Sequence, residues 1–222
     1  MLTIEKTEVF GWDATIRGMR NPMNSWDRSD SDWEFVEDPS IINPNDEVKF
    51  VLGENDEDLM CRLCKGGPVH AKFRRMIAVY VDITAPLYWW KEFDTYKVGT
   101  TANSCSTMHK IHAKEFTLDD FSHEHLTTSN INLLEQIIAV LNNEREDFLE
   151  FKNKDEWWQM IQLLPSSYNQ KRTIAFNYEV LHNIYHSRRN HKLDEWHTVC
   201  DWIESLPYSW IITGKENEDG EA

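Results

Sequence analysis

The segment from Arg75 to Thr84 constrains the fold more than any other part of the sequence. Apolar and polar positions alternate along it, so that one face would carry Ile77, Val79 and Val81 and the other Ala78, Tyr80 and Asp82. A period of two is typical of a strand that packs one face on a core. We therefore predict a strand over residues 75–84, in a domain that mixes strands and helices.

Helices and further strands are predicted on both sides of this strand. Strand patterns cover 3–10 and 173–176, and helical spacing of apolar residues covers 14–20, 54–65, 85–96, 131–151, 157–164 and 178–185, with a last helix that ends near Pro207. Side chains that accept hydrogen bonds favour helix starts, which makes Asp13, Thr84 and Asn177 the expected N-caps.

Two polar segments are predicted to be loops. Residues 24–48 are acidic and rich in turn-forming residues, which indicates a long loop or insertion. Residues 99–107 are rich in Gly, Thr, Ser and Asn, and such loops offer backbone N–H and hydroxyl donors to ligands. We expect one domain over 1–214, with the acidic insertion at about 24–48 and a mobile acidic tail over 215–222.

The charge balance bears on the kind of ligand. The chain has 23 Lys and Arg against 38 Asp and Glu, a net charge of −15. A protein that binds nucleic acid needs a basic face to displace counterions, so this balance argues against such a partner. A small ligand with a phosphate group needs only two or three local cations and stays compatible with the composition.

No segment is expected to cross a membrane. The longest apolar runs, such as 76–81, are far too short for a bilayer, and the N-terminal residues do not resemble a signal peptide. We therefore expect a cytoplasmic protein whose four cysteines, Cys61, Cys64, Cys105 and Cys200, are reduced.

Candidate metal and redox motifs are weak. Cys61 and Cys64 lie one helical turn apart without a second Cys pair, and the His182–His186 pair lacks the glutamate of the HExxH motif. The histidines at 109, 112, 123 and 125 lie in a polar segment that does not fix their geometry. Structural roles are favoured for all of these residues, and no metal site is predicted. The basic cluster Arg188–Lys192 fits a phosphate site and a solvated helix end about equally.

Three segments together resemble the flavin-dependent thymidylate synthases. The first, from His70 to Pro86, is similar to that family's H-x-T-P-F-E-H motif, strand and Ala-Pro helix start. The second, from Thr95 to Thr107, stands where the family has the signature R-H-R-x-x-S-x-x-x-x-S-x-R. The third is similar to the family's C-terminal pattern through Leu164-Pro165, Lys171, Asn177, Asn183 and Arg188. The similarity covers residues 1–20 weakly and 56–207 better.

The resemblance implies an α/β (α+β) fold with a central, mostly antiparallel sheet flanked by helices. It also implies a homotetramer that binds flavin and nucleotide between subunits and methylates dUMP reductively to dTMP with FAD, NADPH and methylenetetrahydrofolate. Arg188 would contact the uracil nucleotide, and the 99–107 loop its phosphate, through Thr100, Cys105, Ser106 and Thr107. The implied flavin contacts are Asn177, Asn183, Lys97 and Asn103. No catalytic residue is assigned.

The signature itself is changed. Its three arginines are replaced by Thr95, Lys97 and Thr107, its histidine by Tyr96, and its two serines by Thr100 and Cys105; the second histidine of the upstream motif is replaced by Met76. Thr or Lys does not reproduce the paired hydrogen bonds of a guanidinium to phosphate. Either other cations compensate, with Lys72, Arg74, Arg75 and Lys110 as candidates, or the ligand has changed.

Three functional hypotheses follow. The first is a divergent flavin-dependent thymidylate synthase-like enzyme. The second is a relative that binds a nucleotide or flavin without this catalysis, or that acts on a modified pyrimidine nucleotide. The third is an interaction protein that uses its aromatic residues as a binding face and takes no small ligand.

Overall fold

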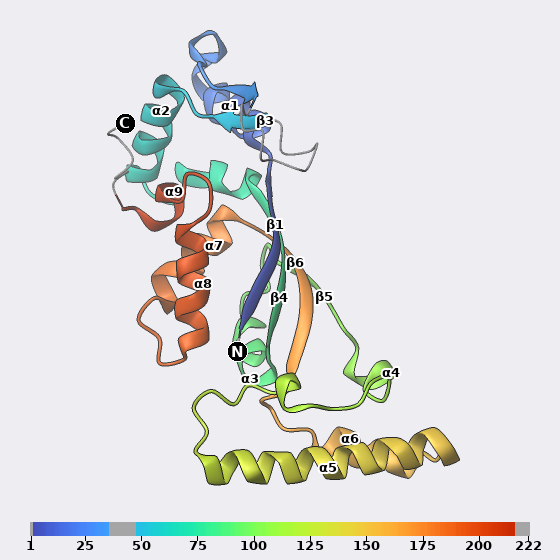
Figure 1. Cartoon of the computed structure of the whole chain (residues 1–222). Helices are drawn as coiled ribbons and strands as arrows, with labels where there is room; N and C mark the ends of the chain where they lie inside the picture. Colours follow the sequence, from blue (N-terminus) through green and yellow to red (C-terminus); the bar gives the residue numbers. More distant parts are fainter. Residues whose placement is uncertain (1, 36–47, 216–222) are drawn as a thin grey trace.

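The core of the fold is a four-stranded antiparallel sheet, seen in a computed structural model that describes residues 2–35 and 48–215. The strand order is β1-β4-β6-β5, as Figure 1 shows. The strands are β1 (Thr3–Phe10), β4 (Ala78–Pro86), β6 (Asn169–Asn177) and β5 (Thr101–Ser104). The predicted strand over 75–84 is thus β4, one of the two central strands, and the predicted fold class is confirmed.

The two faces of β4 differ as its alternation predicts. Val79, Val81 and Ile83 are at most 1% exposed, whereas Tyr80 on the other face is 44% exposed. The buried face packs on the larger hydrophobic cluster, to which helices on one side of the sheet contribute (Figure 1). These helices include α3 (Leu87–Phe93), α7 (Tyr178–Arg188) and α8 (Asp194–Glu204). The other face of the sheet is open within the described residues, where the Phe10 and Tyr80 side chains are exposed.

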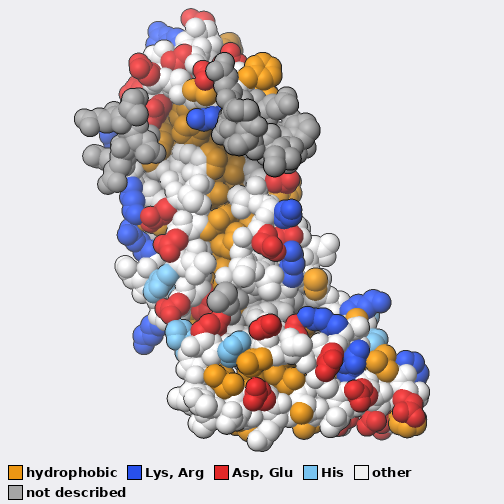
Figure 2. Space-filling view, in the orientation of Figure 1, with side chains coloured by type: hydrophobic (Ala, Val, Ile, Leu, Met, Phe, Trp, Pro, Cys, Tyr) orange, Lys and Arg blue, Asp and Glu red, His pale blue; other side chains and the backbone are white. Residues whose placement is uncertain are grey.

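A second hydrophobic cluster lies at the far end of the sheet (Figure 1). It is built by the hairpin of α5 (Thr128–Phe151) and α6 (Lys154–Leu163) with the chain between Ile111 and Phe121. Both helices were predicted. Figure 2 shows hydrophobic side chains at the surface of this end of the molecule, and Leu133 of α5 is 55% exposed.

The polar segment 24–48, interpreted from sequence as a loop, contains regular structure. It has a short 3-10 helix, Trp26–Arg28, and strand β2 (Asp32–Phe35), which pairs with β3 (Val48–Val51). Trp33 and Phe35 alternate with Asp32 and Glu34 along β2, but the strand is only four residues long and all of them are exposed. Residues 36–47 of this insertion, and 216–222 of the predicted tail, lie outside the described residues.

Two predicted N-caps are wrong. Helix α1 (Trp12–Arg20) begins after Gly11, and Asp13 lies in its first turn, where its carboxylate accepts a hydrogen bond from the Trp33 indole at 3.1 Å. Thr84 pairs with Lys171 because β4 continues to Pro86, so α3 begins two residues later than expected. Pro86 is tolerated there because β1 pairs only as far as Thr84, so the missing N–H costs no bond to β1.

Further helices pack on the helical side of the sheet. They include α2 (Glu54–Lys65), the 3-10 helix η4 (Ala71–Met76) and α9 (Trp210–Thr213). Residues 75 and 76 therefore end a 3-10 turn and do not start β4. In the described part of the chain, no helix has the length and apolar character needed to cross a membrane.

Gly11 is required by its backbone and by its surroundings. Its φ is +98°, and a Cβ added there would lie 2.3 Å from the carbonyl oxygen of Met76. We expect Gly11→Ala to lower the free energy of unfolding by about 2 kcal/mol or more, because a left-handed backbone alone costs about 1–2 kcal/mol. Urea denaturation measures the change. Gly67→Ala is the matched control, since Gly67 also has a positive φ but no atom within 4 Å of an added Cβ; equal losses in both variants would contradict the role of the close contact.

Candidate functional site

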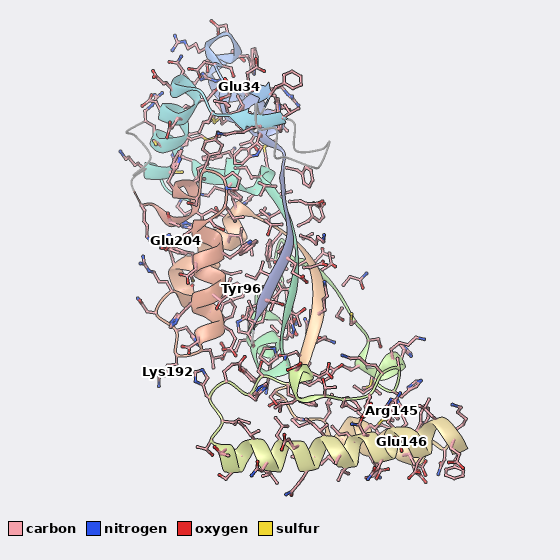
Figure 3. All side chains as sticks on the ribbon, in the orientation of Figure 1. Glu34, Tyr96, Arg145, Glu146, Lys192 and Glu204 are labelled. Atoms are coloured by element: carbon pink, nitrogen blue, oxygen red, sulfur yellow. The ribbon has the colours of Figure 1, made fainter. Side chains whose placement is uncertain are left out.

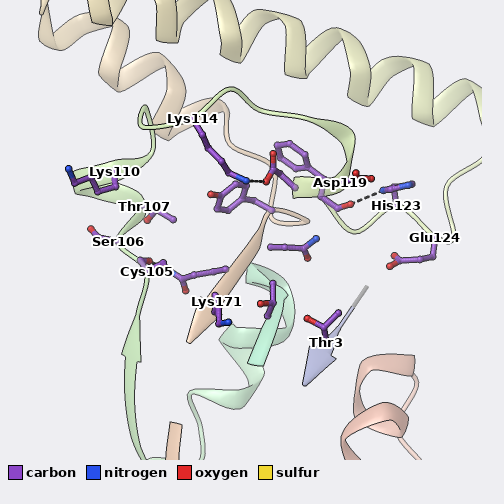
Figure 4. A pocket seen from close by; sticks show the side chains of 16 residues that line it. Thr3, Cys105, Ser106, Thr107, Lys110, Lys114, Asp119, His123, Glu124 and Lys171 are labelled. Carbon is purple, nitrogen blue, oxygen red and sulfur yellow. Dashed lines mark hydrogen bonds and ion pairs between the residues drawn. The ribbon is translucent and has the colours of Figure 1, made fainter. Parts of the chain in front are cut away.

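A large cavity lies where the sheet meets the α5–α6 hairpin. Its volume is about 800 Å³, within the usual range of small-molecule sites. Figure 4 shows its lining residues, which come from the ends of β1, β4 and β6 and from the chain between residues 105 and 124. The cavity therefore joins segments that are far apart in the sequence.

Three of the residues implied by the resemblance line this cavity: Cys105, Ser106 and Thr107 (Figure 4). Strand β5 brings them there by pairing with β6, and the Cys105 N–H donates to the carbonyl of Lys171 at 2.9 Å. Ser106 caps the short helix α4 (Thr107–Lys110) by accepting from the His109 N–H at 3.0 Å. The predicted loop over 99–107 is thus partly an edge strand and partly a helix start.

Gln170 holds this segment in place and was missed from the sequence. It is only 8% exposed. Its side-chain N–H donates to the carbonyl of Cys105 at 2.8 Å, and its side-chain oxygen accepts from Arg172 at 3.0 Å. The Trp90 indole donates to its backbone carbonyl at 2.9 Å. Residue 170 lies outside the predicted strand over 173–176, so no pattern marked it.

Three lysines give the cavity its positive charge. Lys171 lies 3.1 Å from Glu5 and 3.2 Å from Asp82, and hydrogen bonds to these two carboxylates raise its pKa. Lys114 pairs with Asp120, which raises the pKa of Lys114 (Figure 4). Lys110 is exposed and forms no ion pair within the described residues. Lys110 is therefore the cation most available to an anionic ligand.

The acidic side of the cavity is largely committed to the protein itself. The two carboxylate oxygens of Asp120 bind Lys114 and the Thr117 backbone N–H. The His123 ring nitrogen Nδ1 lies 2.7 Å from the carbonyl of Phe121, marked in Figure 4. Tyr168 completes the wall, and burial raises the pKa of its hydroxyl, which stays protonated at neutral pH. Among the described residues, the cavity thus offers neutral donors and the Lys110 ammonium group, beside the carboxylates of Asp119 and Glu124.

Arg188 does not line this cavity. Its Nε donates to the Tyr96 hydroxyl at 2.9 Å, and its Nη1 lies 3.2 Å from the Glu92 carboxylate. The guanidinium also stacks on Trp196, 4.9 Å from the ring centroid. Figure 3 places Tyr96 on the α8 side of the sheet, away from the α5 residues Arg145 and Glu146. Glu92 and Trp196 could not be found from the sequence as partners of Arg188.

The other predicted residues are dispersed. Asn177 caps α7 as predicted, with its side-chain oxygen accepting from the N–H groups of Glu179 and Val180, both at 3.1 Å. Lys97, Asn103 and Asn183 are exposed, and Thr100 is half-buried. None of these residues lines the large cavity. The predicted site residues therefore occupy separate places on a single chain.

Metal ligation finds no support in the described part of the chain. There, no group of three or more His, Cys, Asp or Glu side chains is arranged to hold a metal ion. The rings of His182 and His186 both lie against the carbonyl of Ile212, at 2.7 and 3.1 Å. All four cysteines are free thiols.

Solved structures with the same fold include a thymidylate synthase and a UMP/dUMP methylase. Thymidylate synthase X from Helicobacter pylori, solved with FAD and dUMP, superposes with a TM-score of 0.65 at 15% identity, over 96% of this chain and 97% of the other. A second structure of that enzyme with the same ligands has a TM-score of 0.63 at 14% identity, over 95% of this chain and 97% of the other. The UMP/dUMP methylase PolB from Streptomyces cacaoi, bound with 5-Br UMP, has a TM-score of 0.59 at 12% identity, over 96% of this chain and 95% of the other.

Sequence comparison adds no closer relative. No family model matches the chain, and no curated protein matches it. The chain therefore has the fold of the flavin-dependent thymidylate synthases, over nearly its whole length. At this level of identity the likeness establishes the fold alone.

Proposed function

We propose that this protein binds a pyrimidine nucleotide and methylates it in a flavin-dependent reaction, with dUMP as substrate and FAD, NADPH and methylenetetrahydrofolate as the other reactants. The observation that carries the proposal is the position of Cys105, Ser106 and Thr107. The resemblance assigns these residues to the nucleotide phosphate, and they line a cavity that also holds three lysines. The ligands of the compared structures, dUMP and 5-Br UMP, belong to the same chemical class.

The phosphate is bound by donors different from those of the family signature. Where the signature has an arginine, Thr107 offers a hydroxyl, and the Lys110 ammonium lies at the other end of α4. Charge-assisted hydrogen bonds of this kind contribute about 1.5–3 kcal/mol each. Lys110 is thus the residue that compensates for the missing guanidinium. No protein nucleophile is needed, since bound flavin supplies the hydride and the chain supplies orientation.

The flavin requires more than one copy of the chain. Lys97, Asn103 and Asn183 expose donors, yet they share no cavity among the described residues. They fit a flavin only where a second copy closes the site, and for this reason we propose a homotetramer. The open sheet face supports this arrangement, because Phe10 and Tyr80 are 52% and 44% exposed and pack edge to face on each other.

A second candidate function is nucleotide binding without this catalysis. It is favoured by the ion pair between Arg188 and Glu92, which partly neutralises the guanidinium that the resemblance assigns to the nucleotide. In this case the protein binds dUMP in the large cavity but takes up no FAD and produces no dTMP.

Absorbance and calorimetry separate these functions. We expect the purified protein to take up FAD, seen as a flavin absorbance band that remains after desalting, and to bind dUMP in a calorimetric titration. The resemblance implies a nucleotide site shared between subunits, in which Arg188 of a second copy would reach the dUMP. Arg188→Ala is therefore expected to weaken dUMP binding about tenfold or more, the loss of one charged hydrogen bond. Arg189→Ala is the matched control, since Arg189 is exposed and stacks on Tyr185.

Each result has a defined meaning. A colourless protein that binds dUMP supports the second candidate. A protein that binds neither ligand contradicts both and leaves the interaction-protein hypothesis. Light scattering on the same sample tests the assembly, and a monomer in the presence of both ligands contradicts the shared flavin site.

A further inference from the structure

A second cavity lies on the helical side of the sheet and shares no residue with the first. Its volume is about 460 Å³, and helices α2, α7 and α9 and the 3-10 helix η4 contribute to its walls. The cationic residues in its lining are Lys65, Arg74 and Lys215. The proposed reaction uses none of these residues, although the resemblance made Arg74 one of the candidate cations for the nucleotide site.

Arg74 is the unusual group in this cavity. It is 6% exposed, and its Nε is buried without a hydrogen-bond partner in the described part of the chain. The nearest carboxylate oxygen, on Glu179, lies 3.9 Å from Nη1, which is beyond hydrogen-bonding distance. Buried guanidinium groups are normally saturated with hydrogen bonds, because desolvating them without partners is costly. Arg74 contacts the Cys64 thiol and the Glu179 carboxylate, but its buried Nε has no acceptor in the described part of the chain.

The groups around Arg74 favour an anion with a flat apolar body. Lys65 is exposed at the cavity and forms no ion pair within the described residues, while Lys215 donates to Glu204 at 2.6 Å. Trp210 supplies an aromatic wall, and its indole nitrogen is a buried donor without a described partner. Glu57 is the carboxylate in the lining, so the cationic groups outnumber the acidic ones.

Metal and thiol chemistry do not account for this cavity. His182 and His186 line it, but their ring nitrogens lie against the Ile212 carbonyl, and burial lowers the pKa of His182, so its ring is neutral at pH 7. Burial raises the pKa of both Cys61 and Cys64, which keeps these thiols protonated. What remains is a site for negative charge.

We propose that this second cavity binds a small aromatic anion, with its phosphate or carboxylate group on Arg74 and Lys65 and its ring against Trp210. His182 and His186 of helix α7 line this site, and the same helix carries Asn183 and Arg188, which the resemblance assigns to flavin and nucleotide. The inference does not rest on the proposed nucleotide chemistry, since it uses different residues and a different cavity.

Phenyl phosphate is the compound to test, and the indole N–H resonance of Trp210 in ¹⁵N-labelled protein is the signal to follow. Trp210→Phe identifies that resonance among the ten tryptophans. Titration is expected to shift it saturably, with a Kd of about 1 mM or tighter. Benzoate distinguishes a carboxylate from a phosphate preference. The Trp158 resonance is the internal reference, because Trp158 lies on α6 and lines neither cavity.

Variants assign the shift to the cavity. Arg74→Gln and, separately, Lys65→Gln are expected to weaken binding of phenyl phosphate about tenfold or more. Arg62→Gln, which lies on α2 like Lys65, is expected to leave this affinity unchanged. Arg62 is 65% exposed and pairs with Asp58 at 2.8 Å. Lys65→Gln keeps the test valid if Arg74→Gln fails to fold. An unmoved Trp210 resonance with both compounds, or equal affinities in wild type and Lys65→Gln, would overturn the proposal.

Discussion

Replacement of Asp56 by alanine is expected to lower the free energy of unfolding by about 3–5 kcal/mol, the usual loss when one partner of a buried ion pair is removed. Asp56 is fully buried, and its Oδ1 lies 2.5 Å from Nε of Arg20, which is 3% exposed. Its Oδ2 accepts from the hydroxyls of Ser29 and Ser31 at 2.9 and 2.7 Å. The variant leaves a buried guanidinium and these hydroxyls without their acceptor.

The stabilisation by Asp56 depends on pH. Burial alone would raise the pKa of Asp56, but hydrogen bonds from Ser31, Arg20 and Ser29 and from the Asp30 backbone outweigh it and lower the pKa. A carboxyl whose pKa is lowered by folding stabilises the native state above its unfolded pKa, and this stabilisation is lost as the pH falls through the folded pKa. The difference between wild type and Asp56→Ala should therefore be complete at neutral pH and shrink in acid below about pH 4.

Denaturant unfolding at pH 7 and at pH 3 measures both effects. Asp58→Ala is the matched control, because Asp58 is 66% exposed and pairs with Arg62 one turn along the same helix; exposed pairs contribute about 0–1 kcal/mol. A loss of less than about 1 kcal/mol at pH 7 for Asp56→Ala would show that the buried pair contributes little net stability.

Lys110→Glu should weaken dUMP binding about 100-fold. The substitution removes the one lysine of the large cavity that forms no ion pair among the described residues, and it places a negative charge beside the proposed phosphate. Losing a charged hydrogen bond costs about 1.5–3 kcal/mol, and repulsion between the introduced carboxylate and the phosphate adds to the loss. Because Lys110 is exposed, the fold should tolerate the change.

Calorimetric titration of dUMP into both proteins measures this effect. Lys91→Glu makes the same charge change on α3, outside the cavity, and is expected to leave the affinity within about threefold, as long-range charge effects are screened at physiological salt. Equal weakening by the two substitutions would mean that only net charge matters and that the phosphate does not lie against Lys110.

The sequence predicted the elements whose burial is regular. Strand β4 packs one face on the core, so its alternation is complete, and Asn177 caps α7 because its side chain can reach the free N–H groups of the first turn. The open face of the sheet follows from the same alternation. These features depend on local residues and could be inferred without a structure.

Features that depend on contacts between distant segments of the chain left no local sequence pattern. Strand β5 is an exposed edge strand, so its residues Thr101–Ser104 show no apolar face. Strand β2 has Trp33 and Phe35 on one face, but it is four residues long and lies in an acidic, turn-rich segment that favoured a loop. Gln170 and the Glu92–Arg188 pair join residues that are 65 and 96 positions apart. The resemblance placed Cys105, Ser106 and Thr107 at a common site and made Lys110 a candidate cation. That Lys110 and Lys171 line the same cavity as these residues followed only from the fold.

The two hydrophobic clusters give the molecule more than one cooperative unit. The smaller cluster, with Leu141 and Met160 between α5 and α6, meets the sheet at the Phe121–Tyr168 bridge and at the hydrogen bond from Ser122 to Asn169. Helical hairpins of this kind can open as separate foldons while the larger core stays native. The large cavity lies at the boundary between these two units. A ligand bound there would stabilise the contacts between them, and we expect the two units then to unfold in a single transition.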